Sequence, residues 1–151
     1  MKACVLSDSH TTRIDGLPKA LREALSRADL IVHAGDFTEM AVLKGLQAIG
    51  EVRAVCGNMD SQDLRLTLPA RDTFTLGGKR IGLVHGSGGR EGIAERIREM
   101  FEEVDIIIYG HSHEAGVQTL RGCLMINPGP SRRSFAVLTI GEKTTAEIIE
   151  L

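Results

Sequence analysis

The stretch ACVLSDSH, residues 3–10, begins with a short apolar run and ends with an acidic residue and a histidine close together. An apolar run of this length predicts a buried strand. The apolar residues between positions 17 and 27 recur at helical spacing, and Pro18 suits the first turn of such a helix. Residues 30–32 form a second short apolar run. The start of the chain therefore predicts a strand, a helix and a strand.

The same alternation continues to residue 55. Met40–Ile49 is spaced as a second short helix that we expect to end near Gly50, and residues 52–55 predict a third strand. The order strand, helix, strand, helix, strand is typical of parallel strands joined by right-handed crossovers.

The second half of the chain carries more strands and fewer helices. Gly77-Gly78 is a turn signal between two strand-like runs, and residues 91–101 carry one apolar helical face. The strands expected here are 72–76, 80–84, 104–109, 116–120, 123–126, 135–140 and 145–149. We find no linker, repeat or low-complexity segment. The sequence therefore predicts one α/β domain over residues 1–151, a four-layer αββα sandwich of two mixed sheets packed face to face with helices outside.

The charge and composition exclude several classes of protein. The 151 residues include 18 Lys and Arg against 20 Asp and Glu, a formal charge of -2, so no basic face for an extended nucleic acid is expected. The aromatic content of 3% argues against a base-stacking surface. The hydrophobic content of 42% supports a globular core, and no apolar run approaches the ~20 residues of a membrane helix. Neither nucleic acid nor a membrane is an expected partner.

The three cysteines predict a reducing compartment. Cys4, Cys56 and Cys123 lie in apolar runs at wide spacing, which is a poor framework for disulfides. We expect buried, reduced thiols that act as small hydrophobic side chains. We also expect no signal peptide, because the first residues contain no extended apolar region. These features together predict a cytoplasmic protein.

Five polar clusters stand directly after, or at the ends of, apolar runs. In open α/β sheets ligands bind at the carboxyl ends of the strands, so we expect these side chains to converge. Residues two positions apart, as in D-x-H and H-x-H, point to the same side of an extended segment. The clusters are Asp8-Ser9-His10, Gly35-Asp36, Gly57-Asn58, His85-Gly86 and Gly110-His111-Ser112-His113.

These clusters contain seven candidate metal ligands with nitrogen or oxygen donors: Asp8, His10, Asp36, Asn58, His85, His111 and His113. Seven donors are too many for one ion and suit two ions that share a carboxylate, an arrangement that is known for phosphoester chemistry. Imidazole and carboxylate ligands without thiolate favour Mn, Fe, Zn or Ni, whereas Ca and Mg prefer oxygen alone. The sequence therefore predicts a centre of two divalent ions.

The ordered pattern D-x-H, G-D, G-N, H-G and G-H-x-H resembles that of the calcineurin-like metallophosphoesterase superfamily, specifically its compact phosphodiesterase branch. The resemblance spans about positions 3 to 140 and includes the turn Asn127-Pro128-Gly129 near the site. It implies hydrolysis of a small phosphodiester by a hydroxide that bridges two metal ions, with Mn as the first choice and Ni, Fe or Zn as alternatives. The catalytic residues that it implies are Asn58, Asp36 and His85.

The resemblance also implies how the ligands divide between the ions. One ion is expected to bind Asp8, His10, Asp36 and His113, and the other Asp36, Asn58, His85 and His111, with Asp36 as the bridge. In many larger relatives a histidine that helps to protonate the leaving oxygen follows the asparagine. Here that position is Met59, whose thioether cannot donate a proton, so we expect substrates with a good leaving group. We interpret Asp60 as a residue that orients a partner or a water.

Some residues near the motifs allow more than one interpretation. His33 ends a predicted strand, and we interpret it as a structural or supporting histidine rather than a ligand. Arg132 and Arg133 follow the turn at 127–130, and they either clamp a substrate phosphate or form an exposed, solvated pair. The glycine-rich segment 86–89 is interpreted as backbone that lines the site.

The resemblance leaves two other functions open. A phosphomonoesterase or nucleotidase would use the same metal ions on a different ester. A protein-binding scaffold without catalysis is the third function, as the retromer subunit related to this family implies. In each enzymatic case the expected partner is a small phosphoester substrate, and the small relatives imply that a homo-oligomer is an alternative to a monomer.

Overall fold

The first of two β-sheets contains most of the N-terminal half of the chain and its last hairpin. The computed structural model describes residues 1–151. Strands β1 (Lys2–Leu6), β2 (Leu30–His33), β3 (Val52–Ala54), β9 (Ser134–Ile140) and β10 (Thr144–Glu150) form this sheet. Their order is β10-β9-β1-β2-β3, in which β1, β2 and β3 are parallel and β9 is antiparallel to both of its neighbours.

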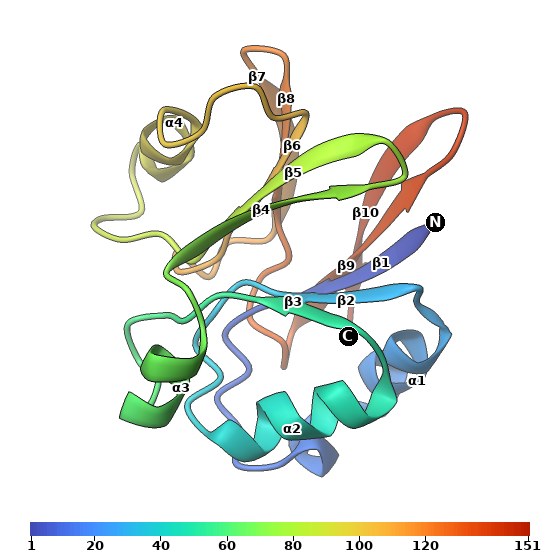
Figure 1. Ribbon diagram of the computed structural model, residues 1–151, viewed down its shortest axis with the longest axis vertical. Coiled ribbons are helices and arrows are strands. Elements are labelled where there is room, and N and C mark those ends of the chain that lie inside the picture. The colour runs from blue at the N-terminus through green and yellow to red at the C-terminus, as the bar shows by residue number, and fades with distance from the viewer.

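The second sheet is also mixed and packs against the first, face to face (Figure 1). It contains β4 (Arg71–Leu76), β5 (Lys79–Val84), β6 (Ile106–Ile108), β7 (Gly116–Leu120) and β8 (Cys123–Asn127). In the order β4-β5-β6-β8-β7 the three central strands are parallel, and the two edge strands are antiparallel to their neighbours. Two five-stranded mixed sheets confirm the predicted fold class.

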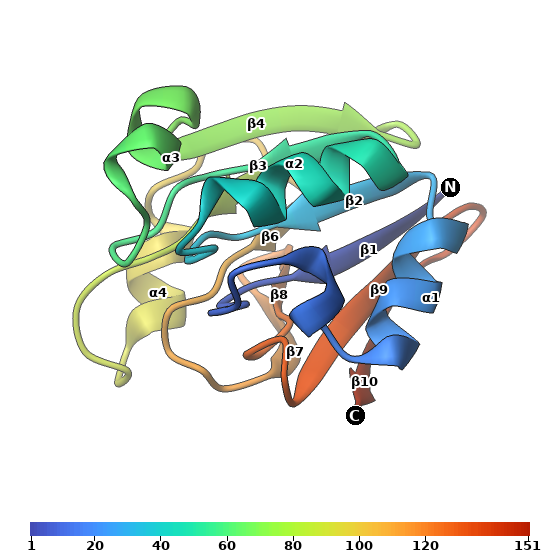
Figure 2. The ribbon, with the colours of Figure 1, turned by 90° about the horizontal axis from the view of Figure 1, so that it is seen from below.

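Helices cover the outer faces of both sheets. Helices α1 (Lys19–Arg27), α2 (Met40–Ile49) and α3 (Gln62–Thr67) belong to the first sheet, and α4 (Ile93–Arg98) belongs to the second. A short 3-10 turn at Ile14–Gly16 precedes α1. Figure 2 views the outer face of the first sheet and shows α1 and α2 lying across it. None of these helices is both long and apolar enough to span a membrane.

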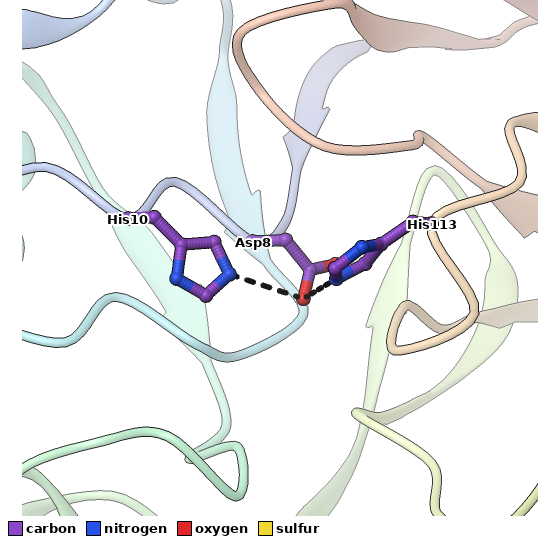
Figure 3. A group of neighbouring side chains, drawn as sticks. All are labelled: Asp8, His10 and His113. Carbon is purple, nitrogen blue, oxygen red and sulfur yellow. Dashed lines mark ion pairs between the residues drawn. The ribbon is translucent and has the colours of Figure 1, made fainter.

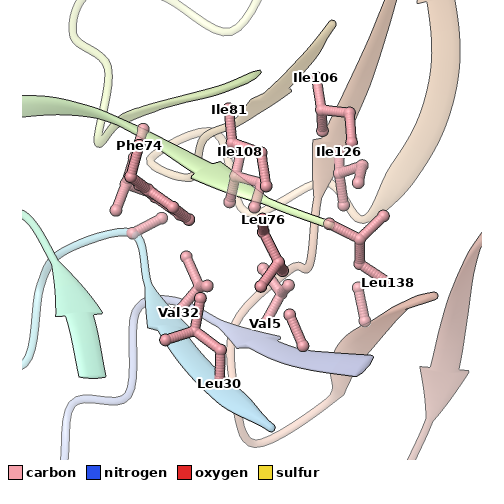
Figure 4. Packing of buried hydrophobic residues seen from close by; sticks show 14 of the residues in the cluster. Val5, Leu30, Val32, Phe74, Leu76, Ile81, Ile106, Ile108, Ile126 and Leu138 are labelled. Atoms are coloured by element: carbon pink, nitrogen blue, oxygen red, sulfur yellow. The ribbon is translucent and has the colours of Figure 1, made fainter. Parts of the chain in front are cut away.

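The core is divided into layers because each strand turns alternate side chains to opposite faces. In β1, Ala3 and Val5 point between the sheets, whereas Cys4 and Leu6 pack under the helices. Figure 4 shows the layer between the sheets, where Val5 and Val32 of the first sheet face residues such as Ile108 of the second. A third layer packs α4 against the second sheet. All three cysteines are free thiols, as predicted, and Cys56 is only partly buried.

The local differences from the sequence prediction lie mostly near the loops. Helix α3 falls within a segment expected to be a loop, and it is only six residues long with one buried side chain, Leu64. Ser61 caps it by accepting a hydrogen bond from the Leu64 N–H at 3.4 Å. The helix expected at 91–101 spans only Ile93–Arg98, and its start is delayed because Gly92 before it has a left-handed φ of 72°. Periodicity predicts the long elements well and short capped ones poorly.

Candidate metal centre

The predicted ligands stand after the carboxyl ends of strands from both sheets, where the loops of the two sheets meet. The seven residues follow β1 (Asp8, His10), β2 (Asp36), β3 (Asn58), β5 (His85) and β6 (His111, His113). Backbone hydrogen bonds join neighbouring loops within each sheet: Asp8 N–H donates to the Gly35 carbonyl at 3.0 Å, and Gly110 N–H donates to the His85 carbonyl at 3.0 Å. The His85 side chain of the second sheet then reaches the first, where its Nδ1 atom donates to the Ala34 carbonyl at 2.8 Å. The two halves of the chain therefore meet at this edge of the sandwich.

The backbone at these positions is unusual. Five of the seven predicted ligands have the positive φ angles that residues other than glycine seldom adopt. Such conformations raise the energy of the folded state and concentrate at functional sites, where surrounding contacts hold them. The five residues are Asp8 (51°), His10 (44°), Asp36 (62°), His111 (69°) and His113 (60°).

The first cluster of side chains contains Asp8, His10 and His113. Figure 3 shows the two histidine rings approaching one carboxylate oxygen of Asp8 from opposite sides. The Nε2 atom of His113 lies 3.3 Å from Asp8 Oδ1, and the Nε2 atom of His10 lies 3.9 Å from the same oxygen. Asp8 is buried and both histidines are exposed, so this cluster opens to solvent on its histidine side.

The second cluster contains Asp8, Asp36 and His85, and all three are buried. The Nε2 atom of His85 lies 3.3 Å from Asp36 Oδ2 and 3.9 Å from Asp8 Oδ1. The other oxygen of Asp36 accepts a hydrogen bond from the Met59 N–H at 2.8 Å. Each cluster brings three potential ligand atoms within 4.8 Å of one another, which is the arrangement a metal ion requires.

The hydrogen bonds around Asp8 and His85 test whether a metal ion fits. The Nδ1 atom of His85 donates to the Ala34 carbonyl at 2.8 Å, which leaves Nε2 as the nitrogen with a free lone pair. Ser7 Oγ donates to Asp8 Oδ2 at 2.8 Å and leaves Oδ1 free. Asp8 Oδ1 and His85 Nε2 are the buried side-chain atoms without a hydrogen-bond partner. Since unpaired buried polar atoms are costly, the donor set fits a divalent cation that both atoms would bind.

The acid–base properties of the buried cluster follow from the contact between Asp36 and His85. Burial by itself favours the neutral form of Asp36, but the close approach of His85, whose Nε2 atom lies 3.3 Å from Asp36 Oδ2, outweighs burial and holds the pKa of Asp36 below its ordinary value. Burial likewise disfavours a charged His85, but Asp36 and then Asp8 outweigh it and raise the pKa of His85. The site thus stabilises positive charge beside the carboxylates.

His111 and Asn58 lie beside the buried cluster rather than within it. The rings of His85 and His111 meet edge to face with their centroids 5.2 Å apart, and His111 Nε2 donates to the Gly88 carbonyl at 3.0 Å. Asn58 is exposed and lines a cavity of about 200 Å³ together with His85. The ligand roles of these two residues therefore stay predictions.

The carboxylate that both clusters contain is Asp8. The resemblance implied Asp36 as the bridge between two ions, but Asp36 belongs only to the buried cluster. A bridging role for Asp36 also stays a prediction.

Asp60 positions the loops around the buried cluster, whereas the sequence interpretation gave it an orienting role toward a partner or a water. Its side chain is buried and accepts three backbone N–H groups, from Gly57 at 2.7 Å, Thr38 at 2.7 Å and Asp36 at 3.1 Å. These bonds join the loop after β2 to the loop after β3. The only sequence signal was its place two residues after Asn58, and aspartate in a turn is too common to indicate such a role.

His33 has the supporting role that the sequence suggested. It is fully buried, its Nδ1 atom accepts the Gly35 N–H at 3.0 Å, and its Nε2 atom donates to Ser9 Oγ at 3.0 Å. Its ring stacks on Phe37 with centroids 3.5 Å apart. Burial, with a further contribution from His85, lowers the pKa of His33 to about 3, so the ring stays neutral and supports both metal-site loops.

Comparison with known proteins agrees with this geometry. The chain is 34% identical over 155 residues to a probable metallophosphoesterase of Methanothermobacter thermautotrophicus, covering 96% of this chain and 90% of that protein. It is 26% identical over 149 residues to phosphodiesterase MJ0936 of Methanocaldococcus jannaschii, covering 85% and 83% of the two chains.

Solved structures share the fold. The crystal structure of wild-type Vps29 complexed with zinc from Entamoeba histolytica superposes with a TM-score of 0.76 at 23% identity, over 99% of each chain. The sequence profile of the calcineurin-like phosphoesterase superfamily domain matches residues 1–143. This match covers nearly the whole chain and all seven predicted ligands, so the chain belongs to the calcineurin-like phosphoesterase superfamily.

Proposed function

We propose that this protein is a metal-dependent phosphodiesterase that hydrolyses small phosphodiesters with two divalent ions. The observation that carries the proposal is the pair of clusters around Asp8, in which two buried ligand atoms, Asp8 Oδ1 and His85 Nε2, have no other partner. A pair of neighbouring cation sites joined by a carboxylate is the arrangement that phosphoester hydrolysis uses. The name of the archaeal relative, a phosphodiesterase, supports the choice of a diester.

The chain's own residues would hold the ions and orient the ester. When bound, the two ions supply a hydroxide for attack on phosphorus and neutralise the phosphoryl oxygens. The proposed ligands are Asp8, His10, Asp36, Asn58, His85, His111 and His113, with Asp36 as the proposed bridge. The free amide of Asn58 can donate to a phosphate oxygen when its carbonyl binds metal.

Proton donation to the leaving group distinguishes this chain from many larger relatives. The residue after Asn58 is Met59, whose side chain is 59% exposed and has no proton to give. A poor leaving group needs a proton as it departs, whereas a phenolate of low basicity does not. We therefore propose that the enzyme favours esters of good leaving groups.

We propose Mn²⁺ as the metal, with zinc, nickel or iron as alternatives. Carboxylate and imidazole ligands without thiolate suit these ions. The zinc complex of Vps29, which has the same fold, makes zinc the first alternative to test. The three free cysteines favour a reducing compartment, and on that basis we propose a cytoplasmic location.

The experiment that tests the proposal compares a diester and a monoester. Protein dialysed free of metal is assayed with bis(p-nitrophenyl) phosphate and with p-nitrophenyl phosphate, with and without Mn²⁺. We expect turnover of the diester only with metal and its loss in EDTA. Turnover of the monoester alone would replace the proposal with a phosphomonoesterase, and diester turnover that persists in EDTA would exclude a dissociable metal site.

A protein-binding scaffold is the second candidate function. Leu66 of α3 is 79% exposed, and the exposed Met59 precedes the same helix, so apolar side chains stand on the surface near the site. The structural similarity to Vps29 keeps this candidate open. A scaffold would keep its partner binding in the Asp36→Asn variant, whereas the proposed hydrolase would lose turnover.

A further inference from the structure

The turn between β8 and β9 is fixed to both segments that carry the open cluster. Ser131 donates to the carbonyl of Ser7, the residue before Asp8, through its N–H at 3.1 Å and its Oγ at 2.7 Å. Asn127 Nδ2 donates at 2.9 Å to the Oγ of Ser112, which lies between the two histidines of the H-x-H motif. Ser7, Ser131 and Asn127 are buried. The turn therefore cannot move without moving the metal-site loops.

The turn also packs tightly against the segment that follows His113. Gly129 has a φ of +76°, and a Cβ atom at this position would meet Ser134 Oγ and would lie 2.9 Å from the Cβ atom of Ala115. Ser134 Oγ donates to the Pro128 carbonyl at 2.6 Å and closes the turn. Only glycine fits here, so the position of the turn is set by its own sequence.

Arg132 and Arg133 stand on this fixed turn without a carboxylate partner. Both are exposed, and both line a cavity of about 390 Å³ that also includes His113. Some other arginines do pair with acids, as Arg53 does with Asp72 at 3.4 Å and Arg90 with Glu114 at 3.3 Å. Glu150 also lines the cavity, and it forms no ion pair with either guanidinium.

We propose that Arg132 and Arg133 form an anion subsite for a second phosphate group of the substrate, separate from the phosphate that is hydrolysed. Guanidinium groups bind phosphate through two parallel hydrogen bonds, and a pair of them without acidic partners attracts an anion rather than a cation. His113 belongs to both the open cluster and this cavity, so one substrate can reach both. The preferred substrate class is thus a phosphodiester that carries a further phosphate.

The meaning of this subsite depends on the proposed phosphodiesterase function, but its binding of phosphate can be measured without catalysis. Protein free of metal is titrated with inorganic phosphate while NMR follows the Nε–H signals of the arginines. We expect saturable shifts at Arg132 and Arg133, and little change at Arg27, an exposed arginine at the end of α1. Equal shifts at all exposed arginines, or none at the pair, would overturn the proposal.

Variants identify the groups that bind. The double variant Arg132→Gln, Arg133→Gln should weaken phosphate binding about tenfold or more, because each substitution removes charge-assisted hydrogen bonds to the phosphate. Arg132→Lys with Arg133→Lys should keep part of the affinity, since the charge remains without the planar pair of donors. Arg27→Gln is the matched control and should bind phosphate as the wild type does. Unchanged affinity in the double glutamine variant would contradict the proposal.

Kinetics with a matched pair of substrates connects the subsite to the reaction. Thymidine 5′-(p-nitrophenyl phosphate) is compared with the same compound bearing a 3′-phosphate, in the presence of Mn²⁺. In the double glutamine variant we expect the KM of the 3′-phosphorylated substrate to rise about tenfold while its kcat stays unchanged. The KM of the substrate without the 3′-phosphate should change about twofold at most. Equal effects on both substrates would overturn the subsite. Turnover of neither substrate by the wild type would refute the proposed function instead, and the phosphate titration would still decide the subsite.

Discussion

The two clusters that share Asp8 differ in how much solvent they meet. The side chains of Asp36 and His85 are each 4% exposed, whereas the side chains of His10 and His113 are 37% and 47% exposed. Backbone groups hold both residues of the buried pair, but no hydrogen bond fixes the rings of His10 and His113. The difference teaches that one half of the candidate centre is held rigidly and closed to solvent, while the other half is open to solvent.

The largest effect should come from breaking the buried cluster. Asp36→Asn or His85→Ala should lower kcat/KM for the diester by about two orders of magnitude or more, because the geometry of both ions depends on these ligands. The measurement is Mn²⁺-dependent turnover, with Asp63→Asn, the same change on the exposed face of α3, as the control. Turnover near that of the wild type would refute the mechanism.

The open cluster should be less sensitive in the same assay. In His10→Ala a solvent molecule can enter the position of the lost ring, so we expect a loss of about tenfold rather than a hundredfold. Equal losses in His10→Ala and His85→Ala would show that exposure does not separate the two halves.

Metal binding should stabilise the fold, and mostly through the buried cluster. At a free Mn²⁺ concentration about 100 times the Kd, binding to the folded state alone adds about 2.7 kcal/mol to the free energy of unfolding. Urea unfolding with and without Mn²⁺ measures this difference. We expect His85→Ala to lose most of it and His10→Ala to keep part, and equal stability with and without metal would contradict the account.

Removing the charge of Asp60 should loosen the loops that carry Asp36. An asparagine has one acceptor oxygen, so its NH₂ group would face at least one of the N–H groups of Asp36, Thr38 and Gly57. We expect Asp60→Asn to lower the free energy of unfolding by about 1–3 kcal/mol in metal-free protein. Asp63→Asn again serves as the control. A loss of unfolding free energy no larger than that of the control would show that the three hydrogen bonds to Asp60 do not stabilise the fold.

A separate, pH-dependent effect concerns the neutral His33 behind the buried cluster. Its pKa is about 3 in the folded state and about 6.5 when unfolded, so the unfolded state takes up a proton first as the pH falls. Its contribution to stability is complete above pH 6.5 and is lost on acidification towards pH 3, at up to about 1.4 kcal/mol per pH unit. Between pH 7 and 4 the stability of the metal-free wild type should fall more steeply than that of His33→Gln, because the variant keeps every other titrating group and lacks only this one. The same slope in both proteins would contradict a neutral His33.

The sequence allowed the fold and the position of the site to be predicted, because both depend on local patterns. Apolar runs such as residues 3–6 and 30–32 form strands, and the polar residues that follow them in the sequence lie at the carboxyl ends of those strands. Helix α3 was missed because six residues with one buried leucine leave no measurable periodicity.

The finer details of the site depend on contacts between distant residues, and no local pattern encodes them. The sharing of Asp8 by both clusters, the three N–H groups on Asp60 and the anchoring of residues 127–134 all join different loops. The same holds for the exposure of His10 and His113, which depends on what the folded chain leaves uncovered. These features required the structure.

The most direct test of a two-ion hydrolytic centre is the Mn²⁺ content of the protein measured together with its diester turnover. Metal-free protein is titrated with Mn²⁺, and bound metal and turnover of bis(p-nitrophenyl) phosphate are followed in the same samples. For a two-ion centre we expect turnover to reach its maximum at two bound ions per chain and to be abolished by EDTA. Full turnover with one ion bound, or turnover that persists in metal-free protein, would contradict that expectation.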